Sequence, residues 1–148
     1  MPQTLSFNLV HIIFSTKHRT PLINDDIPAG LHAYLAGTAR SLDCECFRVG
    51  GVADHVHLAV RLAPTRTAAR FVSEIKTGSS VWMKQKGVSE FAWQRGYGLF
   101  SVGPADLGAL AGYIDGQAMH HRKRSFQDEM RGFFGKYHIA FDERYVWD

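Results

Sequence analysis

LSFNLVHIIF, residues 5–14, is the stretch that most directly indicates the fold. It is rich in β-branched and aromatic side chains and has few polar members, which predicts a buried strand. Similar patterns predict further strands at 44–52, 55–62 and 91–102, and helices at about 28–42, 65–86 and 105–134. This order is that of a ferredoxin-like or RRM-like split βαβ unit with an added helix. We therefore expect an α+β fold with an antiparallel sheet, helices on one face, an open second face and a C-terminal helix.

Length and composition place the chain among ordinary globular proteins. Its 148 residues, 45% apolar and 21% charged, predict one domain spanning residues 1–148. The net charge of +3 permits a polyanionic partner without requiring one. Cys44 and Cys46 are two apart on a predicted strand, where a disulfide between them would be badly strained, so reduced thiols are favoured. No apolar run reaches the roughly 18 residues of a membrane span, so we expect a cytoplasmic protein with no membrane partner.

His55 and His57 form a candidate metal pair on the third predicted strand. Residues two apart on a strand face the same way, so both imidazoles would project from one face, with Val56 between them pointing to the other. Such a pair can give two nitrogen ligands to one divalent ion. Two surface histidines with no ligand role fit the spacing equally well, and a metal site needs a third ligand.

Tyr113 and Gln117 are candidates for the chemistry that such a metal would assist. They are four residues apart on the last predicted helix and therefore share a face. Gln117 could provide the missing oxygen ligand. A tyrosine phenolate can attack a phosphodiester and form a phosphotyrosine bond, although a tyrosine in an amphipathic helix is usually a core residue. No residue in the sequence identifies itself as a general base.

Four features together resemble the HUH single-tyrosine transposases of bacterial insertion sequences and their repeat-associated relatives. They are the His-hydrophobic-His motif at 55–57, the Tyr113–Gln117 spacing, VHIIFSTKHR at 10–19 and FAWQRGYGLFSV at 91–102. The resemblance extends over essentially the whole chain in the family's order. It implies a metal-dependent transposase that nicks single-stranded DNA and transfers the strand.

The resemblance also implies specific roles and partners. Tyr113 would be the nucleophile that forms a 5′-phosphotyrosine and releases a 3′-hydroxyl, and His55, His57 and Gln117 would bind Mg²⁺ or Mn²⁺. The substrate would be single-stranded DNA with a hairpin near the cleavage site. The protein would be a homodimer, whose active site could be built within one subunit or across two.

Basic residues near the predicted chemistry are candidates for DNA contacts. Clusters of this kind bind phosphate and give affinity without sequence choice, and they are also common on solvated faces. The candidates are Lys17, Arg19, Arg66, Arg70, His120, His121, Arg122, Lys123 and Arg124.

Three alternative functions fit parts of the sequence. An RRM-like binding module that carries HxH by chance would bind nucleic acid without cleaving it. An HUH initiator of replication or conjugation is usually longer and has a three-histidine metal site, whereas the third ligand predicted here is Gln117. A metal hydrolase would use water and leave Tyr113 with a structural role.

Overall fold

A four-stranded antiparallel sheet forms the middle layer of the molecule. The computed structural model describes residues 2–24 and 26–148. The strand order is β2-β3-β1-β4. The strands are β1 (Asn8–Ser15), β2 (Glu45–Val52), β3 (His55–Leu62) and β4 (Gly98–Ser101). The fold class predicted from the sequence is confirmed.

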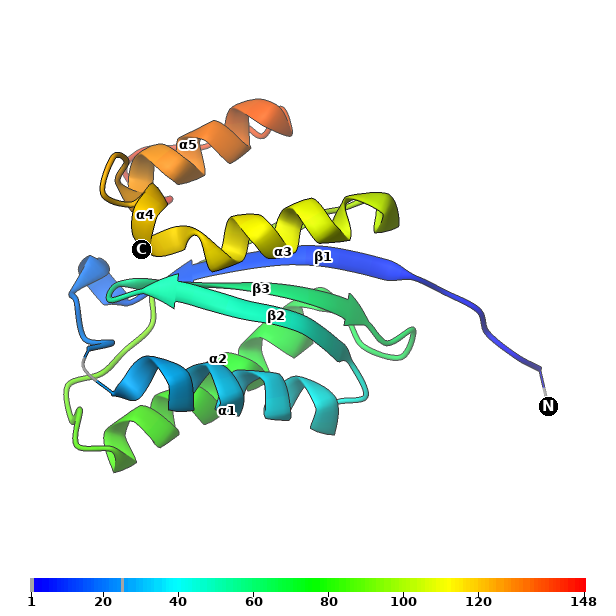
Figure 1. Ribbon diagram of the computed structural model, residues 1–148, viewed down its shortest axis with the longest axis horizontal. Coiled ribbons are helices and arrows are strands. Elements are labelled where there is room, and N and C mark those ends of the chain that lie inside the picture. The colour runs from blue at the N-terminus through cyan, green and yellow to red at the C-terminus, as the bar shows by residue number, and fades with distance from the viewer. Residues whose placement is uncertain (1, 25) are drawn as a thin grey trace.

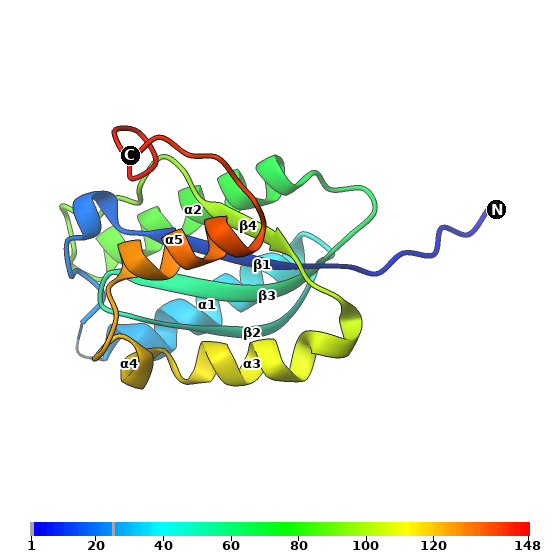
Figure 2. The same ribbon diagram turned by 90° about the horizontal axis from the view of Figure 1, so that it is seen from above.

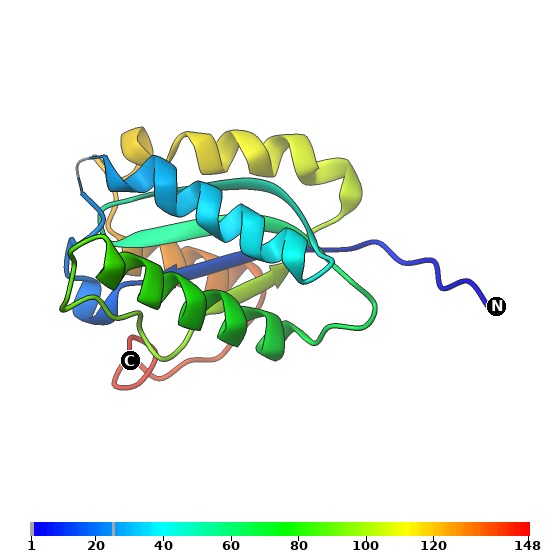
Figure 3. The same ribbon diagram turned by 90° about the horizontal axis from the view of Figure 1, so that it is seen from below.

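Helices cover both faces of this sheet, so the molecule has three layers (Figure 1). Helices α1 (Ile27–Ser41) and α2 (Ala68–Gln85) lie on one face (Figure 3). Helices α3 (Leu107–Asp115), α4 (Gln117–His120) and α5 (Phe126–Lys136) lie on the other (Figure 2). Short 3-10 turns occupy Lys17–Arg19 and Pro104–Asp106. No helix in the described part of the chain has the length and apolarity needed to cross a membrane.

Alternation along the central strands assigns each residue to one of two cores. Ile12, Phe14, Val56 and Leu58 pack with α1 and α2 in the larger core. The intervening residues face α3 and α5, and there the antiparallel register places Ile13 opposite His57. Both cores depend on the period of two that a strand imposes.

Three details differ from the sequence-based prediction. The second sheet face is not open, because α3 and α5 cover it. The single helix expected at 105–134 is wrong: the chain forms α3, α4 and α5, separated by Gly116 and by the turn at 121–125. Glycine weakens a helix, and the Ser125 side chain caps α5 by accepting a hydrogen bond from the Asp128 amide.

The strand predicted at 91–102 is shorter than expected. Only Gly98–Ser101 pairs as a strand of the sheet, apart from an isolated bridge between Thr16 and Trp93. The irregular segment before it is fixed by Lys76, whose ammonium donates to the carbonyls of Gln94, Arg95 and Gly96. A side chain thus satisfies backbone groups that a strand ladder would otherwise pair.

Gly50 allows α3 to pack closely on β2. A Cβ atom at Gly50 would lie 2.7 Å from the backbone oxygen of Ile114. We expect Gly50→Ala to move α3 away from the sheet and to cost roughly 1–3 kcal/mol, as overpacking generally does. Urea unfolding measures the loss. Gly112→Ala, on α3 itself, is the control, because its Cβ would meet nothing within 4 Å; equal destabilisation by both changes would contradict this account.

Candidate active site

The two histidines of β3 present their Nε2 atoms to a shared buried centre beneath α3 and α5. Both side chains are fully buried, and their ring centroids are 5.1 Å apart. The Nδ1 atom of His55 lies 2.7 Å from Oδ1 of Asp54, and Nδ1 of His57 lies 2.8 Å from Nε2 of His11. Partners of this kind fix ring orientation and leave the other nitrogen available as a ligand.

The residues predicted from the last helix meet these histidines within one chain. Oε1 of Gln117 lies 3.3 Å from Nε2 of His55, and Gln117 donates from Nε2 to the backbone oxygen of Tyr113. The ring centroids of Tyr113 and His57 are 5.8 Å apart. The structure therefore brings together His55, His57, Tyr113 and Gln117, which the sequence had suggested as a set.

Glu129 on α5 lies at the middle of the site and was not predicted. Its side chain is 1% exposed. Its Oε1 atom lies 3.2 Å from Nε2 of His57, 3.2 Å from Nε2 of His121 and 3.6 Å from Nε2 of His55. Its Oε2 atom accepts the Tyr113 hydroxyl and lies 3.4 Å from Nε2 of His120. The sequence signal was a carboxylate on the apolar stripe of a helix, since Glu129 is flanked there by Phe126 and Met130.

Four of these side chains could hold a metal ion. One ligand atom from each of His55, His57, His121 and Glu129 lies within 4.8 Å of the others. Nε2 of His57 is buried and, among the described residues, lacks a hydrogen bond of acceptable geometry. Imidazole nitrogens with a carboxylate oxygen are an ordinary donor set for a divalent metal. His121, predicted only as a DNA contact, thus belongs to this centre, and His120, predicted in the same way, contacts Glu129 beside it.

Burial and mutual contact control the charges in the site. Burial lowers the pKa of His57 to about 4, despite the raising effect of Glu129. Burial, reinforced by His57, lowers the pKa of His11 to about 3. Burial alone would raise the pKa of Glu129, but hydrogen bonds from His121 and Tyr113, with the close contact of His57, outweigh it and hold that pKa well below its usual range. At neutral pH the site therefore contains a carboxylate and two unprotonated imidazoles.

The phenol of Tyr113 is held in its protonated form by the same surroundings. Burial raises its pKa, and the hydrogen bond and negative charge of Glu129 raise it further. A groove of about 530 Å³ between α3 and α5 leads to this residue. Its lining includes His11, Tyr113, Phe133, Lys136 and Tyr137.

We expect the metal-free protein to lose stability as the pH falls from about 6.5 towards 4. An unfolded histidine protonates near pH 6.5, whereas His57 in the fold protonates only near 4. The unfolded state binds more protons between these values, so this stability is complete above 6.5 and is lost at about 4. At about 1.4 kcal/mol per pH unit of pKa difference, His57 contributes roughly 3 kcal/mol.

Urea unfolding in the presence of a chelator, between pH 7.5 and 4, measures this effect. His57→Gln should make the profile less steep in that window, while the lowered pKa of His11 keeps the remaining pH dependence. The raised pKa of His121 acts in the opposite sense, mainly at the upper end of the window and above it. A profile that is flat for the unmodified protein would contradict the assignment.

The predicted DNA-contacting residues fall into separate groups. Arg19, His121 and Arg124 line one pocket of about 340 Å³ together with Asp54. His120, Arg122, Lys123 and Arg124 line a neighbouring pocket at α4. Lys17 is exposed just after β1.

Arg66 and Arg70 lie away from the centre. Arg70 is on α2, Arg66 just precedes that helix, and both contact Glu74 across the sheet from the centre.

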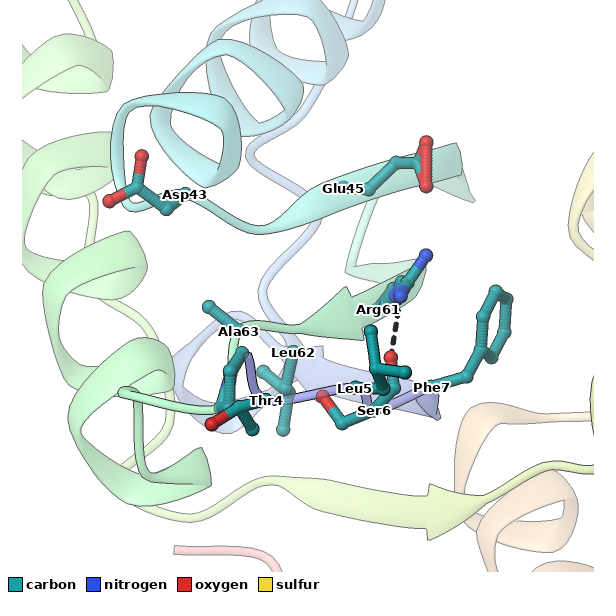
Figure 4. Close-up of a pocket in the computed structure, with 10 residues that line it drawn as sticks. Thr4, Leu5, Ser6, Phe7, Asp43, Glu45, Arg61, Leu62 and Ala63 are labelled. Carbon is teal, nitrogen blue, oxygen red and sulfur yellow. Dashed lines mark hydrogen bonds between the residues drawn. The ribbon is translucent and has the colours of Figure 1, made fainter. Parts of the chain in front are cut away.

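A further pocket lies at the opposite end of β3 (Figure 4). Its lining includes residues 4–7, Asp43, Glu45 and Arg61, and Arg61 donates to the carbonyl of Ser6. This pocket contains neither a histidine nor a tyrosine. The candidate chemistry is therefore confined to the His55 end of the strand.

Comparison with known proteins identifies the family of this chain. A family model described as "Transposase IS200 like" matches residues 6–117, which include His55, His57, Tyr113 and Gln117. The match ends before His121 and Glu129. No curated relative matches the chain.

Two solved structures share the fold. One is a candidate transposase from Deinococcus radiodurans R1, 23% identical, with a TM-score of 0.61 over 79% of this chain and 96% of that one. The other is a REP-associated tyrosine transposase bound to a REP hairpin, 14% identical, with a TM-score of 0.59 over 82% of this chain and 74% of that one. Identities this low support the fold alone. The family model matches residues 6–117, which is most of this chain, and the chain therefore belongs to the family of IS200-like transposases.

Proposed function

We propose that this protein nicks single-stranded DNA and transfers the cut strand through a covalent bond to Tyr113. The observation that carries the proposal is that, in an IS200-like transposase, the Tyr113 ring lies beside His57 and its hydroxyl donates to Glu129, which contacts the buried pair His55 and His57. The phenol oxygen would attack the scissile phosphorus and form a 5′-phosphotyrosine. The bond from phosphorus to the 3′ oxygen would break, and that oxygen would leave as a 3′-hydroxyl after gaining a proton.

Strand joining would be the reverse reaction. A 3′-hydroxyl attacks the phosphotyrosine, restores a phosphodiester and returns the phenol. The phosphotyrosine retains the energy of the broken linkage, so no nucleotide cofactor is needed. In each direction one phosphorus–oxygen bond forms and one breaks.

His55, His57 and Gln117 would hold Mg²⁺ or Mn²⁺. Such an ion would stabilise the charge that develops on the phosphate and lower the cost of forming a phenolate beside Glu129. Asp54 orients the imidazole of His55 and His11 orients that of His57, in each case through the Nδ1 atom of the oriented ring. Oε2 of Glu129 accepts the hydrogen bond of the Tyr113 hydroxyl and so orients it, and this oxygen is the nearest acceptor for the phenol proton.

The basic residues around the centre support a DNA substrate. Arg19 and Arg124 share a pocket with His121, which itself contacts Glu129. Phosphates held there would lie next to the proposed chemistry. A hairpin-bearing single strand fits the family, and the REP-associated relative was solved bound to a REP hairpin. Lys17, Arg66, Arg70, His120, Arg122 and Lys123 remain proposed contacts.

Two further aspects of the proposal concern organisation. We propose that residues 1–148 form a single HUH transposase-like catalytic domain, and that the protein acts as a homodimer. The placement of Tyr113 and Gln117 beside His55 in one chain supports an active site built within a subunit. Size measurement with and without DNA tests the dimer.

The test of function is a covalent adduct. Protein, Mn²⁺ and end-labelled single-stranded hairpin DNA are mixed and separated on a denaturing gel. We expect a labelled band at the mass of protein plus DNA, which disappears when Mn²⁺ is chelated. Cleavage without an adduct would indicate a metal hydrolase. Binding without cleavage of any hairpin in a diverse library would indicate an RRM-like binding module.

The number of histidine ligands does not distinguish a transposase from a replication or conjugation initiator. A third histidine, His121, lies in the centre with His55 and His57, so a three-histidine site does not by itself indicate a replication or conjugation initiator. The match to the IS200-like family favours the transposase instead.

A further inference from the structure

The metal centre proposed above has one feature that the HxH motif and Gln117 do not account for. An anionic oxygen from α5 occupies the space between the histidine nitrogens. Helix α5 lies beyond the part of the chain that matches the family model. The HxH motif and Gln117 therefore do not explain why a carboxylate from α5 lies among the histidines.

The distances from Glu129 to the three histidines are close to those between ligands of a single small cation. A tetrahedral ion with ligand bonds of about 2.0–2.1 Å separates its donors by roughly 3.3 Å. Oε1 of Glu129 lies 3.2, 3.2 and 3.6 Å from the Nε2 atoms of His57, His121 and His55. All four donors lie within 4.8 Å of one another. The four side chains thus approach the geometry of a coordination shell.

The polar contacts of His55 and His57 also favour a cation. Nδ1 of His55 donates to a carboxylate oxygen of Asp54, which only accepts. Nε2 of His55 faces the oxygens of Gln117 and Glu129. The neighbouring Nε2 of His57 is buried and lacks a hydrogen bond among the described residues. A buried polar atom without a partner is costly, and a metal ion bound at Nε2 of His57 would remove that cost.

We propose that Glu129 is a metal ligand, which with His55, His57 and His121 forms a centre that favours transition-metal ions and ties α5 to the sheet. Three imidazoles and one carboxylate suit Zn²⁺ or Mn²⁺, whereas Mg²⁺ prefers oxygen ligands and retains its waters. The same carboxylate accepts the Tyr113 hydroxyl through Oε2. A metal bound at Oε1 therefore also fixes the position of the nucleophile.

Two consequences follow for the ion and for α5. Zn²⁺ and Mn²⁺ should bind more tightly than Mg²⁺ in the absence of DNA. Helix α5 is otherwise held by apolar contacts of Phe126, Met130 and Phe134 and should become more protected when the metal binds. This inference deepens the metal site of the proposed function, but it does not depend on the chemistry of Tyr113.

Metal titration of the full-length protein tests the proposal. After treatment with a chelator, Zn²⁺, Mn²⁺ and Mg²⁺ are titrated by calorimetry. The proteins compared are the wild type, Glu129→Gln and the control Glu143→Gln, whose exposed side chain pairs with Arg131. We expect Glu129→Gln to weaken Zn²⁺ binding by at least about 100-fold, since even residues that only support a ligand cost 10–100-fold. Glu143→Gln should bind as the wild type does.

Hydrogen exchange supplies a second readout. Zn²⁺ should slow amide exchange in α5 of the wild type and not in Glu129→Gln. If Glu129→Gln does not fold, His121→Gln takes its place, because His121 is only partly buried. Unchanged Zn²⁺ affinity in a folded variant, or Mg²⁺ binding as tight as Zn²⁺ in the wild type, would overturn the proposal.

These outcomes are separable from the test of function. Covalent adduct formation with unchanged metal affinity in Glu129→Gln would support the transposase and reject this ligand. Glu129-dependent metal binding with no adduct would support the ligand and reject the proposed chemistry.

Discussion

Tyr113→Phe should abolish the covalent protein–DNA adduct and reduce strand cleavage by about 10⁴-fold or more, the scale on which loss of a nucleophile acts in other covalent enzymes. Phenylalanine keeps the ring, which packs against the rings of His57 and Phe133. Only the oxygen that would attack phosphorus is removed. Adduct yield on a denaturing gel and single-turnover cleavage rates measure the effect.

The stability of this variant should change much less than its activity. The hydroxyl donates to Glu129, and a buried acceptor that loses a partner costs about 1–3 kcal/mol. His121 still contacts that carboxylate. Tyr137→Phe is the matched control, since Tyr137 lines the same groove and its hydroxyl donates to the Ser101 carbonyl. An adduct that persists in Tyr113→Phe would mean that another residue is the nucleophile.

His57→Ala should cause the second large loss, because it removes a metal ligand that lies 3.2 Å from Glu129. We expect metal affinity to fall by more than about 100-fold, beyond what supporting residues contribute. Cleavage should fall with it at any attainable metal concentration. Calorimetric titration with Mn²⁺ and the adduct assay measure the two losses separately.

A distant histidine provides the control for this change. His32 lies on α1, across the sheet from the site, and His32→Ala should leave both metal affinity and cleavage unchanged. Gln117→Ala should reduce both by less than His57→Ala, because a neutral amide is a weaker ligand than an imidazole. Full activity in His57→Ala with normal folding would exclude the HxH pair as the metal site.

The sequence predicted the fold class, and simple periodicities grouped four candidate site residues into two pairs. A period of two on β3 places His55 and His57 on the same face, and a spacing of four brings Tyr113 and Gln117 together. Contacts of this kind lie within one element, where spacing alone determines which side chains are neighbours. Family resemblance then linked the two elements, and the structure places them in contact within one chain.

Glu129 and His121 could not be assigned in the same way. The expected continuous helix from 105 to 134 would have carried Glu129 along one straight axis away from β3. The breaks at Gly116 and at 121–125 instead turn α5 back over the sheet. Neither break is strong enough to be read from a single sequence, since each costs only a fraction of the packing free energy that decides helix placement.

The sequence by itself determined the order of the strands and the first two helices, the apolar faces of these elements and which residues within one element act together, because local dihedral preferences and hydrophobic periodicity set these features. Only the tertiary structure decided that α3 and α5 cover the second sheet face and that a buried carboxylate lies among the histidines. The reason is physical: the position of α5 depends on burying Phe126, Met130 and Phe134 against a distant strand, and contacts between residues far apart in the chain leave no periodic signal in the sequence.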